Sequence, residues 1–226
     1  MNNYDWSNLQ TNGEVKTYTA ANGETSKFGI DVSYHNGNID WATVASEGVQ
    51  FAFVRVGWRG YDQGQISEDP MADTNISQAM SNGIDVGLYF FSQAITEDEA
   101  REEADFICDF ADLYGITDFP IVFDMESIDN TASRIDSLTT EERTQIALAF
   151  CARVEERGYT PMIYGNDAWL NGKFDLQQIS KYSLWLSQYN EQPSASYAFD
   201  IWQYSCTGTI NGIDTDVDLD LIFPSG

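Results

Sequence analysis

The chain has 226 residues, of which 42% are hydrophobic and 21% charged, so it has enough apolar side chains for a globular core and is not a disordered chain. Its formal net charge of -25 at pH 7, from 11 Lys and Arg against 36 Asp and Glu, would repel nucleic acids and anionic membrane surfaces. No apolar run approaches the roughly 20 residues that span a bilayer, so we expect no nucleic-acid partner and no membrane insertion.

The first 26 residues show neither helical nor strand periodicity. They are polar and rich in Asn, Thr and Gly, without the apolar core of a secretory signal peptide. We expect residues 1–26 to form a flexible leader or a linker remnant. Residues 27–226 should then form a single domain, because one barrel domain often reaches this length.

A first strand is predicted over residues 28–33, where Asp31 interrupts an apolar run. A carboxylate in a buried strand is costly unless it is paired or functional, so Asp31 is a candidate site residue. The next turn contains His35 and leads into a short helix over residues 41–47. As the only histidine, His35 fits a hydrogen-bonded loop residue better than a catalytic base, and a zinc site or a Ser-His-Asp triad is disfavoured.

Strands and helices alternate after this point. Strands are predicted over residues 51–57 and 86–91, with a polar helix over residues 70–81 between them. Such alternation indicates a mainly parallel sheet with helices packed against it.

Two longer helices open with the capping-box pattern, a Thr followed three residues later by a Glu. The first begins with Thr96 and Glu99, and the second begins with Thr139 and Glu142 and ends at Gly158. Apolar residues fall on one face of each helix. These are Ala100, Ala104, Ile107, Cys108 and Ala111 in the first helix and Ile146, Phe150 and Val154 in the second.

The chain has three cysteines, Cys108, Cys151 and Cys206, which cannot all pair with one another and which lack metal-ligand spacing. Cys108 and Cys151 fit small buried residues on helices, with a disulfide between them as the alternative. Cysteine usage therefore leaves the cellular compartment open, and we expect no metal site.

Residues 119–126 form an apolar strand that ends in two acids. Asp124 and Glu126 lie two residues apart, which is the repeat of a strand, so both should project to the same side of the sheet at its C-terminal edge. Paired carboxylates suit glycoside hydrolysis, in which a shared cleft keeps one protonated and the other ionised. An ordinary pair of surface acids is the alternative.

Helices fade in the last part of the chain. Strand-like runs at residues 162–164, 183–186 and 201–204 are joined by segments with at most short helices, such as one that Asp175 could cap. Eight candidate strands in one domain favour a closed α/β barrel over an open sheet, with helices reduced or missing in the C-terminal part.

Between residues 214 and 220 every second residue is acidic. The pattern resembles the start of a calcium loop, but Leu219 stands where that loop needs glycine, so a strand with one acidic face is the better interpretation. Aligned acids of one sign repel, so this face should meet solvent, a cleft or a bound group. Asp218, between two apolar residues, is a further candidate site acid.

Four motifs, in this order along the chain, resemble those of the family-25 glycoside hydrolases, the CH-type lysozymes. They occupy residues 29–33 with 35–37 and 39–41, then 124–126, 202–204 and 217–220. The likeness extends from about residue 28 to residue 223. Two positions depart from the family pattern, because Phe90 stands where His is frequent and Asp220 stands where Asn is frequent.

This resemblance implies an irregular TIM-like barrel and lysozyme activity, the hydrolysis of β-1,4 bonds between N-acetylmuramic acid and N-acetylglucosamine in bacterial peptidoglycan, without metal or organic cofactor. The matching positions give the acidic cluster Asp31, Asp124, Glu126 and Asp218. Glu126 is the expected general acid, and Asp124 is expected to assist the 2-acetamido group of the substrate, with retention at the anomeric carbon. We expect a monomer that is extracellular or associated with the cell wall, with phage-type release as the alternative.

Aromatic residues make up 14% of the chain, and most of them must pack in the core. Tyr89, Tyr164 and Trp185 lie near the C-terminal ends of predicted strands, where a barrel cleft opens, so they are candidates for stacking on sugar rings. Gln203 is a candidate for hydrogen bonding to the substrate.

Two other functions share some of these features. A chitinase-like N-acetylglucosaminidase also uses an Asp-x-Glu pair at a strand end, but its longer motif requires acids where this chain has Phe119 and Val122. A non-catalytic cell-wall-binding domain would keep the fold and would be expected to lose some of the four acids, all of which are present.

Overall fold

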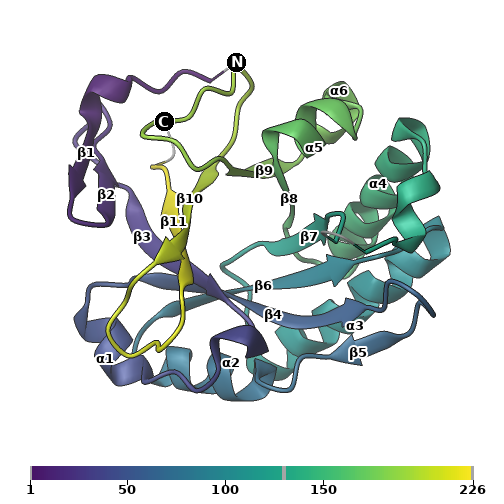
Figure 1. Cartoon of the computed structure of the whole chain (residues 1–226), viewed down its shortest axis with the longest axis horizontal. Helices are drawn as coiled ribbons and strands as arrows, with labels where there is room; N and C mark the ends of the chain where they lie inside the picture. Colours follow the sequence, from purple (N-terminus) through teal and green to yellow (C-terminus); the bar gives the residue numbers. More distant parts are fainter. Residues whose placement is uncertain (1, 129–130, 225–226) are drawn as a thin grey trace.

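Eight strands form a closed barrel in the computed structural model, which describes residues 2–128 and 131–224 (Figure 1). In order around the barrel they are β3 (Lys27–Val32), β4 (Phe51–Arg59), β6 (Asp85–Ser92), β7 (Ile121–Met125), β8 (Pro161–Asn166), β9 (Ser183–Ser187), β10 (Ile201–Gly208) and β11 (Val217–Ile222). β3 closes the barrel by pairing parallel to β4 and antiparallel to β11. β11 is also antiparallel to β10, and the remaining neighbours in the barrel run parallel. The short β5 (Ile66–Glu68) adds to the end of β4.

Helices cover the outside of the barrel where the chain alternates regularly. They are α1 (Trp41–Ser46), α2 (Ala72–Ser81), α3 (Glu97–Tyr114), α4 (Thr140–Glu156), α5 (Asp167–Gly172) and α6 (Leu176–Ile179). In the part of the chain that the structure describes, no helix separates β9 from β10 or β10 from β11, which confirms the predicted loss of helices in the C-terminal part. Of the described helices, none combines the length and apolar character needed to cross a bilayer.

The N-terminal segment packs against the barrel wall that has no covering helix (Figure 1). The 3-10 helix η1 (Trp6–Asn8) leads into a hairpin of β1 (Leu9–Asn12) and β2 (Val15–Tyr18). Tyr4 stacks on the ring of Phe223, with ring centroids 4.2 Å apart.

This ordered arrangement differs from the flexible leader or linker remnant that we expected over residues 1–26. Periodicity does not reveal the hairpin, because β1 has only four residues and three of them are exposed. Contacts with β10 hold it instead: the Tyr204 hydroxyl donates to the carbonyl of Glu14 at 3.0 Å, and the ammonium of Lys16 lies over the rings of Trp202 and Tyr204. The hairpin thus takes the place of a helix on the outer face of β10.

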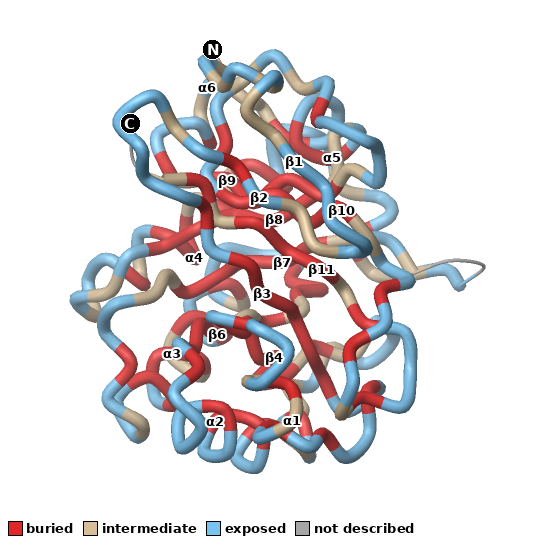
Figure 2. The backbone as a smooth tube through the Cα atoms, turned by 90° about the vertical axis from the view of Figure 1, so that its left-hand side faces the viewer, coloured by how far each residue is buried: buried red, intermediate tan, exposed pale blue. Residues whose placement is uncertain are grey.

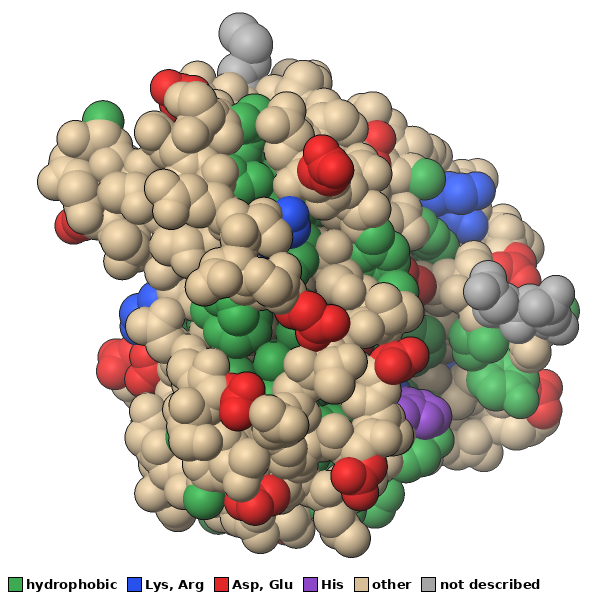
Figure 3. All heavy atoms as spheres, turned by 60° about the vertical axis from the view of Figure 1, so that its left-hand side comes forward, with side chains coloured by type: hydrophobic (Ala, Val, Ile, Leu, Met, Phe, Trp, Pro, Cys, Tyr) green, Lys and Arg blue, Asp and Glu red, His purple; other side chains and the backbone are tan. Residues whose placement is uncertain are grey.

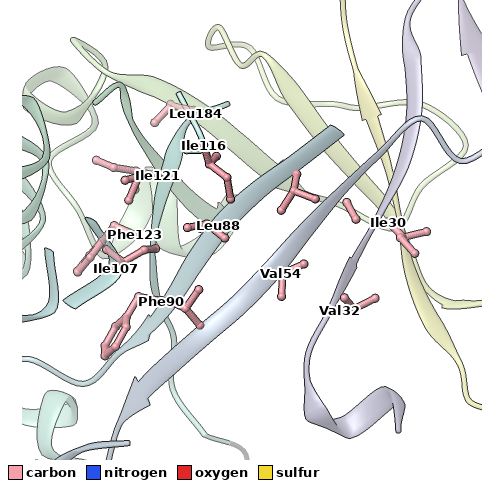
Figure 4. Close-up of a cluster of buried hydrophobic side chains, with 14 of the residues drawn as sticks. Ile30, Val32, Val54, Leu88, Phe90, Ile107, Ile116, Ile121, Phe123 and Leu184 are labelled. Atoms are coloured by element: carbon pink, nitrogen blue, oxygen red, sulfur yellow. The ribbon is translucent and has the colours of Figure 1, made fainter. Parts of the chain in front are cut away.

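Side chains alternate between two packed layers along the barrel strands. Outward-facing residues such as Val54, Leu88 and Phe123 belong to the buried cluster between the strands and the helices, and Ile107 of α3 lies beside Phe123 (Figure 4). The ring of Phe123 also lies 5.0 Å from that of Phe150 on α4. Figure 2 shows the result along the backbone, with the barrel strands largely buried and the outer turns exposed.

A second apolar cluster fills the barrel interior. It consists of Phe51, Phe53, Val122, Met162, Tyr164, Trp185 and Ile201. Two glycines make room for it, because Gly29 pairs with Phe51 and Gly87 pairs with Phe53 on the neighbouring strand. A Cβ atom would lie 2.4 Å from the Phe51 ring at Gly29 and 2.3 Å from the Phe53 ring at Gly87, well inside the normal carbon contact distance of about 3.5–4.0 Å. The rings fill the interior at this level and separate the hollows at the two ends of the barrel.

The two predicted capping boxes both mark helix starts, with one difference in detail. At α4, Thr139 and Glu142 form the reciprocal capping box. At α3, the Thr96 hydroxyl accepts from the Glu99 N–H, but the Glu99 carboxylate pairs with Arg134 at 2.7 Å. The other oxygen of that carboxylate, Oε2, accepts from the backbone N–H of Ile95 at 2.8 Å, so the second half of the box reaches the residue before Thr96 instead of Thr96 itself.

Cys108 and Cys151 were predicted to be small buried residues on helices, and their burial agrees with that prediction. Cys108 on α3 and Cys151 on α4 are buried and not bonded to each other. Cys206 is exposed on β10. The disulfide alternative is therefore wrong.

Candidate active site

A cavity of about 580 Å³ opens toward the C-terminal ends of the parallel barrel strands. All of the residues predicted for the site line this cavity: Asp31, Tyr89, Asp124, Glu126, Tyr164, Trp185, Gln203 and Asp218. They come from β3, from β6 through β11 and from the residue that follows β7. Closure of the barrel is therefore what brings them together.

The pairing of β3 with β11 sets two of the acids side by side. Asp31 is in register with Asp218, although the two are far apart in the sequence. Because β11 runs antiparallel to β3, an acid near the start of β11 meets an acid near the end of β3. Asp124 and Glu126 face the same cavity, as their two-residue spacing predicts.

The carboxyl groups in the cavity have perturbed pKa values. Burial raises the pKa of Asp31 to about 6, against the lowering effect of its hydrogen bonds and of the Arg55 charge. Burial raises the pKa of Asp218 to about 8, and the charge of Asp31 adds to that shift. The pKa of Asp124 lies well above the usual carboxyl range, because burial and then the charges of Glu126 and Asp31 favour its neutral form. The cavity can therefore hold protonated carboxyl groups toward neutral pH, which acid catalysis requires.

Asp124 has an unused hydrogen-bonding position. Its side chain lines the cavity, and its Oδ1 atom is buried without a hydrogen-bond partner among the described residues. A buried polar atom without a partner is costly, so a donor on a bound molecule would be stabilising there.

Glu126 lies closer to the surface, and its backbone carbonyl accepts from the side-chain amide of Gln93 at 2.9 Å, which helps to hold the chain after β7.

Gln203 is the centre of a buried hydrogen-bond network. Its Nε2 donates to Oδ2 of Asp31 at 2.7 Å, and its Oε1 accepts from the hydroxyls of Tyr164 and Tyr189, each at 2.9 Å. Only 3% of Gln203 is exposed. The network holds Asp31 in place, and Gln203 itself also lines the cavity, where the sequence suggested a substrate contact.

The aromatic residues of the cavity differ in how much surface they offer. Trp185 is 2% exposed, and its ring lies 4.6 Å from Phe53 and 4.9 Å from Tyr164, so it is not an open stacking platform as predicted. Its Nε1 donates instead to Oδ1 of the buried Asp220 at 3.0 Å. Tyr189, two residues after β9, lines the cavity and is 52% exposed. Sequence reasoning missed Tyr189, although its position just after a barrel strand is a usable signal.

Arg55 is a second residue that sequence reasoning missed. Within the described part of the chain it is the one Lys or Arg that lines the cavity. Its Nε donates to Oδ2 of the buried Asp69 at 3.0 Å, and its guanidinium lies over the rings of Tyr34 and Trp58. A cation inside the apolar run of residues 51–57 was the available signal, because a buried charge is retained only where it is paired or used.

Acidic side chains outnumber basic ones on the face of the molecule that Figure 3 shows. On the face drawn in Figure 3, His35 (purple) marks the edge of the cavity, acidic side chains are scattered, and Lys and Arg are sparse. No group of three or more His, Cys, Asp or Glu within residues 2–128 and 131–224 is arranged to hold a metal ion. In the alternating acidic stretch, Asp214 and Asp216 are exposed, whereas Asp218 faces the cavity and Asp220 is fully buried.

Comparison with known proteins agrees with this geometry. Lysozyme M1 of Streptomyces globisporus is 28% identical over 200 residues, which are 84% of this chain and 65% of that protein. The bacterial lysozyme of Streptomyces coelicolor superimposes with a TM-score of 0.71 at 26% identity, over 88% of this chain and 93% of that one. The modular autolysin LytC of Streptococcus pneumoniae shares the fold, with a TM-score of 0.77 at 24% identity over 95% of this chain.

The chain spans 65% of the length of lysozyme M1 and 52% of the length of the LytC chain, so these relatives have further segments that it does not match. The family match covers most of the candidate site. Residues 30–213 match the family described as glycosyl hydrolases family 25, and that range holds all of the predicted site residues other than Asp218. The chain therefore belongs to glycosyl hydrolases family 25.

Proposed function

We propose that this chain is a lysozyme that hydrolyses the β-1,4 bond between N-acetylmuramic acid and N-acetylglucosamine in bacterial peptidoglycan. Membership of the family and the likeness to lysozyme M1 support this class of substrate. The observation that carries the proposal is the pair of acids at the end of β7: Asp124 has a buried oxygen without a donor among the described residues, and Glu126 stands beside it in the same cavity. An N-acetyl sugar offers both an N–H for the first acid and a glycosidic oxygen for the second.

In the first step, Glu126 donates its proton to the glycosidic oxygen as the bond from that oxygen to the anomeric carbon breaks. The carbonyl oxygen of the sugar's own 2-acetamido group forms a bond to the anomeric carbon from the opposite face, which gives a cyclic oxazolinium. The Asp124 carboxylate accepts a hydrogen bond from the acetamido N–H and stabilises the positive charge that develops on that group.

In the second step, water attacks the anomeric carbon and the ring of the intermediate reopens. The Glu126 carboxylate takes the proton that the water loses, which returns Glu126 to its acid form, and two inversions give net retention. Asp31 and Asp218 lie around this pair, where their charges favour the protonated state of their neighbours.

Substrate binding should also bring Asp124 into its working state. In the empty cavity, burial and the charge of Glu126 are the two largest causes that raise the pKa of Asp124. A proton on Glu126 removes the second cause, and a hydrogen bond from the acetamido N–H favours the ionised carboxylate. Both changes lower the pKa of Asp124, toward the ionised form that the mechanism uses.

We assign sugar stacking to the partly exposed Tyr189, with Tyr89 and Tyr164 lining the cavity beside it. The substrate is a polymer of the bacterial wall, so the place of action is outside the cell or at the wall, reached by export or by release during phage lysis. We propose that the chain acts as a monomer, because its own eight strands close the barrel and supply the predicted site residues.

The bond that is cut provides the test. A muramidase leaves N-acetylmuramic acid at the new reducing end, so borohydride reduction of the digest followed by sugar analysis should yield reduced muramic acid. Reduced glucosamine in its place would assign the chain to the glucosaminidases. Proton NMR of the first product from a soluble glycan should show the β-anomer, and initial α-anomer would contradict the acetamido mechanism.

Two variants separate catalysis from binding. Glu126→Gln keeps the shape of the side chain without a proton to donate, so it should abolish the loss of turbidity of a wall suspension while the protein still pellets with the walls. Asp124→Asn should reduce the rate comparably, because the amide cannot stabilise positive charge. Wild-type protein that pellets with walls and leaves them intact would favour a wall-binding domain instead.

A further inference from the structure

Asp220 is a further acid at the site, behind the five that line the cavity: Asp31, Asp124, Glu126, Asp216 and Asp218. It is fully buried on β11, where it pairs with Gln203 of β10 and Gly29 of β3. Its Oδ1 accepts from the Nε1 of Trp185 at 3.0 Å, whereas its Oδ2 has no donor among the described residues. Asp31 is the diagonal neighbour of Asp220 on the same face of the two strands, because Asp218 pairs with Asp31 and Asp220 pairs with Gly29, and each carboxyl group affects the pKa of the other.

Two ionised carboxylates cannot hydrogen-bond, because both are acceptors only. A contact between them requires one proton, and two like charges buried side by side would repel strongly. The titratable groups that face Asp220 are Asp31 on β3, Asp218 on its own strand and the Tyr204 phenol on β10, and none of them carries a positive charge. The pair therefore has to hold a proton.

The surroundings decide which of the two acids holds that proton. Asp31 already accepts from the Gln203 amide at 2.7 Å and is influenced by the positive charge of Arg55, and both favour its ionised form. Asp220 receives one neutral donor, the indole of Trp185. Burial accordingly raises the pKa of Asp220 well above the usual carboxyl range, while that of Asp31 rises only to about 6.

We propose that Asp220 is a neutral carboxylic acid that donates its proton to Asp31 and so keeps Asp31 ionised and oriented in the active site. Its effect on catalysis rests on the proposed function, whereas its protonation does not. Asp220 is a positioning residue, because it lies behind Asp31 and does not line the cavity. An amide in place of Asp220 could donate the same hydrogen bond to Asp31. Only the carboxylic acid, however, would stop donating it when a rise in pH removes its proton.

The first test is spectroscopic and needs no activity. A protonated carboxyl group has an infrared C=O band separate from that of a carboxylate, so the difference spectrum of wild type minus Asp220→Asn at neutral pH should contain a protonated carboxyl band. Asp214→Asn is the matched control, because Asp214 is exposed and does not line the cavity, and it should leave that band unchanged. A protonated band that is equally strong in wild type and Asp220→Asn would overturn the proposal. Should Asp220→Asn not fold, Asp31→Asn is the second variant: its amide donates to Asp220 and should allow it to ionise, which also removes the band.

The second test is proton linkage in folding. A carboxyl group whose pKa is raised in the folded state stabilises the protein below its unfolded pKa of about 4, and that stability is lost as pH rises toward the folded pKa. Wild type should therefore lose stability relative to Asp220→Asn between about pH 5 and pH 8, with the ratio of their folding constants changing roughly tenfold per pH unit. Urea unfolding at several pH values measures this ratio. A ratio that does not vary with pH would mean that Asp220 is ionised, and Asp214→Asn should give that flat result.

The third test concerns catalysis. Asp220→Asn keeps a donor for Asp31 and an acceptor for Trp185, whereas Asp220→Leu removes both. The leucine variant should lose kcat by at least about tenfold relative to the asparagine variant with little change in KM, since Asp31 loses a hydrogen bond to its charged group. Equal kcat values for the two variants would overturn the positioning role. If wild type has no lysozyme activity, the proposed function fails. The spectroscopic and linkage tests still show whether Asp220 is protonated.

Discussion

Replacing Gly87 with alanine should destabilise the barrel from the inside. Gly87 on β6 pairs with Phe53 on β4, and an added Cβ would lie 2.3 Å from Cε1 of the Phe53 ring. Normal carbon contacts are about 3.5–4.0 Å, so the ring would have to move by more than about 1 Å. Phe53 is fully buried and its ring lies 4.6 Å from Trp185, so there is no free space to receive it. Overpacking of this kind costs about 1–3 kcal/mol, and we expect Gly87→Ala near the upper end of that range.

The assay is urea unfolding followed by both far-ultraviolet circular dichroism and tryptophan fluorescence. Gly172→Ala is the matched control, because Gly172 is the last residue of α5 and an added Cβ would meet nothing within 4 Å. It should be neutral or stabilise by up to about 1 kcal/mol, since alanine loses less backbone entropy on folding. The same substitution should thus have opposite effects at the two glycines.

A second-site change identifies the cause. Phe53→Leu should recover part of the loss in the Gly87→Ala background, so that the double variant is more stable than the two single effects predict by at least about 0.5 kcal/mol. A Gly87→Ala protein within about 0.5 kcal/mol of wild type would refute the reasoning, and so would a double variant whose losses simply add.

Three further predictions concern the site and the charge of the chain. Gln203→Met removes the 2.7 Å donor to Asp31 and should raise the Asp31 pKa further, so the acid limb of the pH–activity profile should move to higher pH by roughly one unit, whereas Tyr189→Phe should leave that limb in place. Bacterial walls are largely anionic and the chain carries a net charge of -25, so activity should rise from low to moderate salt, and a monotonic fall would contradict this. Arg157 pairs with three acids of α3 at 2.7–2.9 Å, so Arg157→Gln should lower the free energy of unfolding by about 1–2 kcal/mol, against about 0–0.5 kcal/mol for the exposed Arg101→Gln, as measured by urea unfolding.

Local signals predicted the fold and the position of the main acids. The alternation of strands and helices, the helix starts at Thr96 and Thr139, and the strand that carries Asp124 and Glu126 all depend on residues close together in the chain. Period-2 spacing alone is enough to place these two acids on one side of a strand.

The contacts between distant strands could not be predicted in the same way. Gln203 binds Asp31 across 172 positions of sequence, and only the barrel register decides that its amide is used by the protein instead of the substrate. The burial of Trp185 depends likewise on Phe53, which reaches it because Gly87 has no side chain. The type of a side chain can therefore mark it as a candidate site residue. Tertiary packing then determines whether that side chain supports another site residue or is exposed to the substrate.

The position of β11 in the barrel has a consequence for synthesis. β3 is complete at Val32, but the partner that closes the barrel begins at Val217. At roughly 5–20 residues per second, a ribosome needs about ten to forty seconds to make the intervening chain. Until then the edge of β3 that pairs with β11 stays unpaired, and Asp31 lacks Asp218 and Asp220. A nascent chain therefore cannot assemble the acidic cluster, so any activity that depends on this cluster arises only in finished molecules.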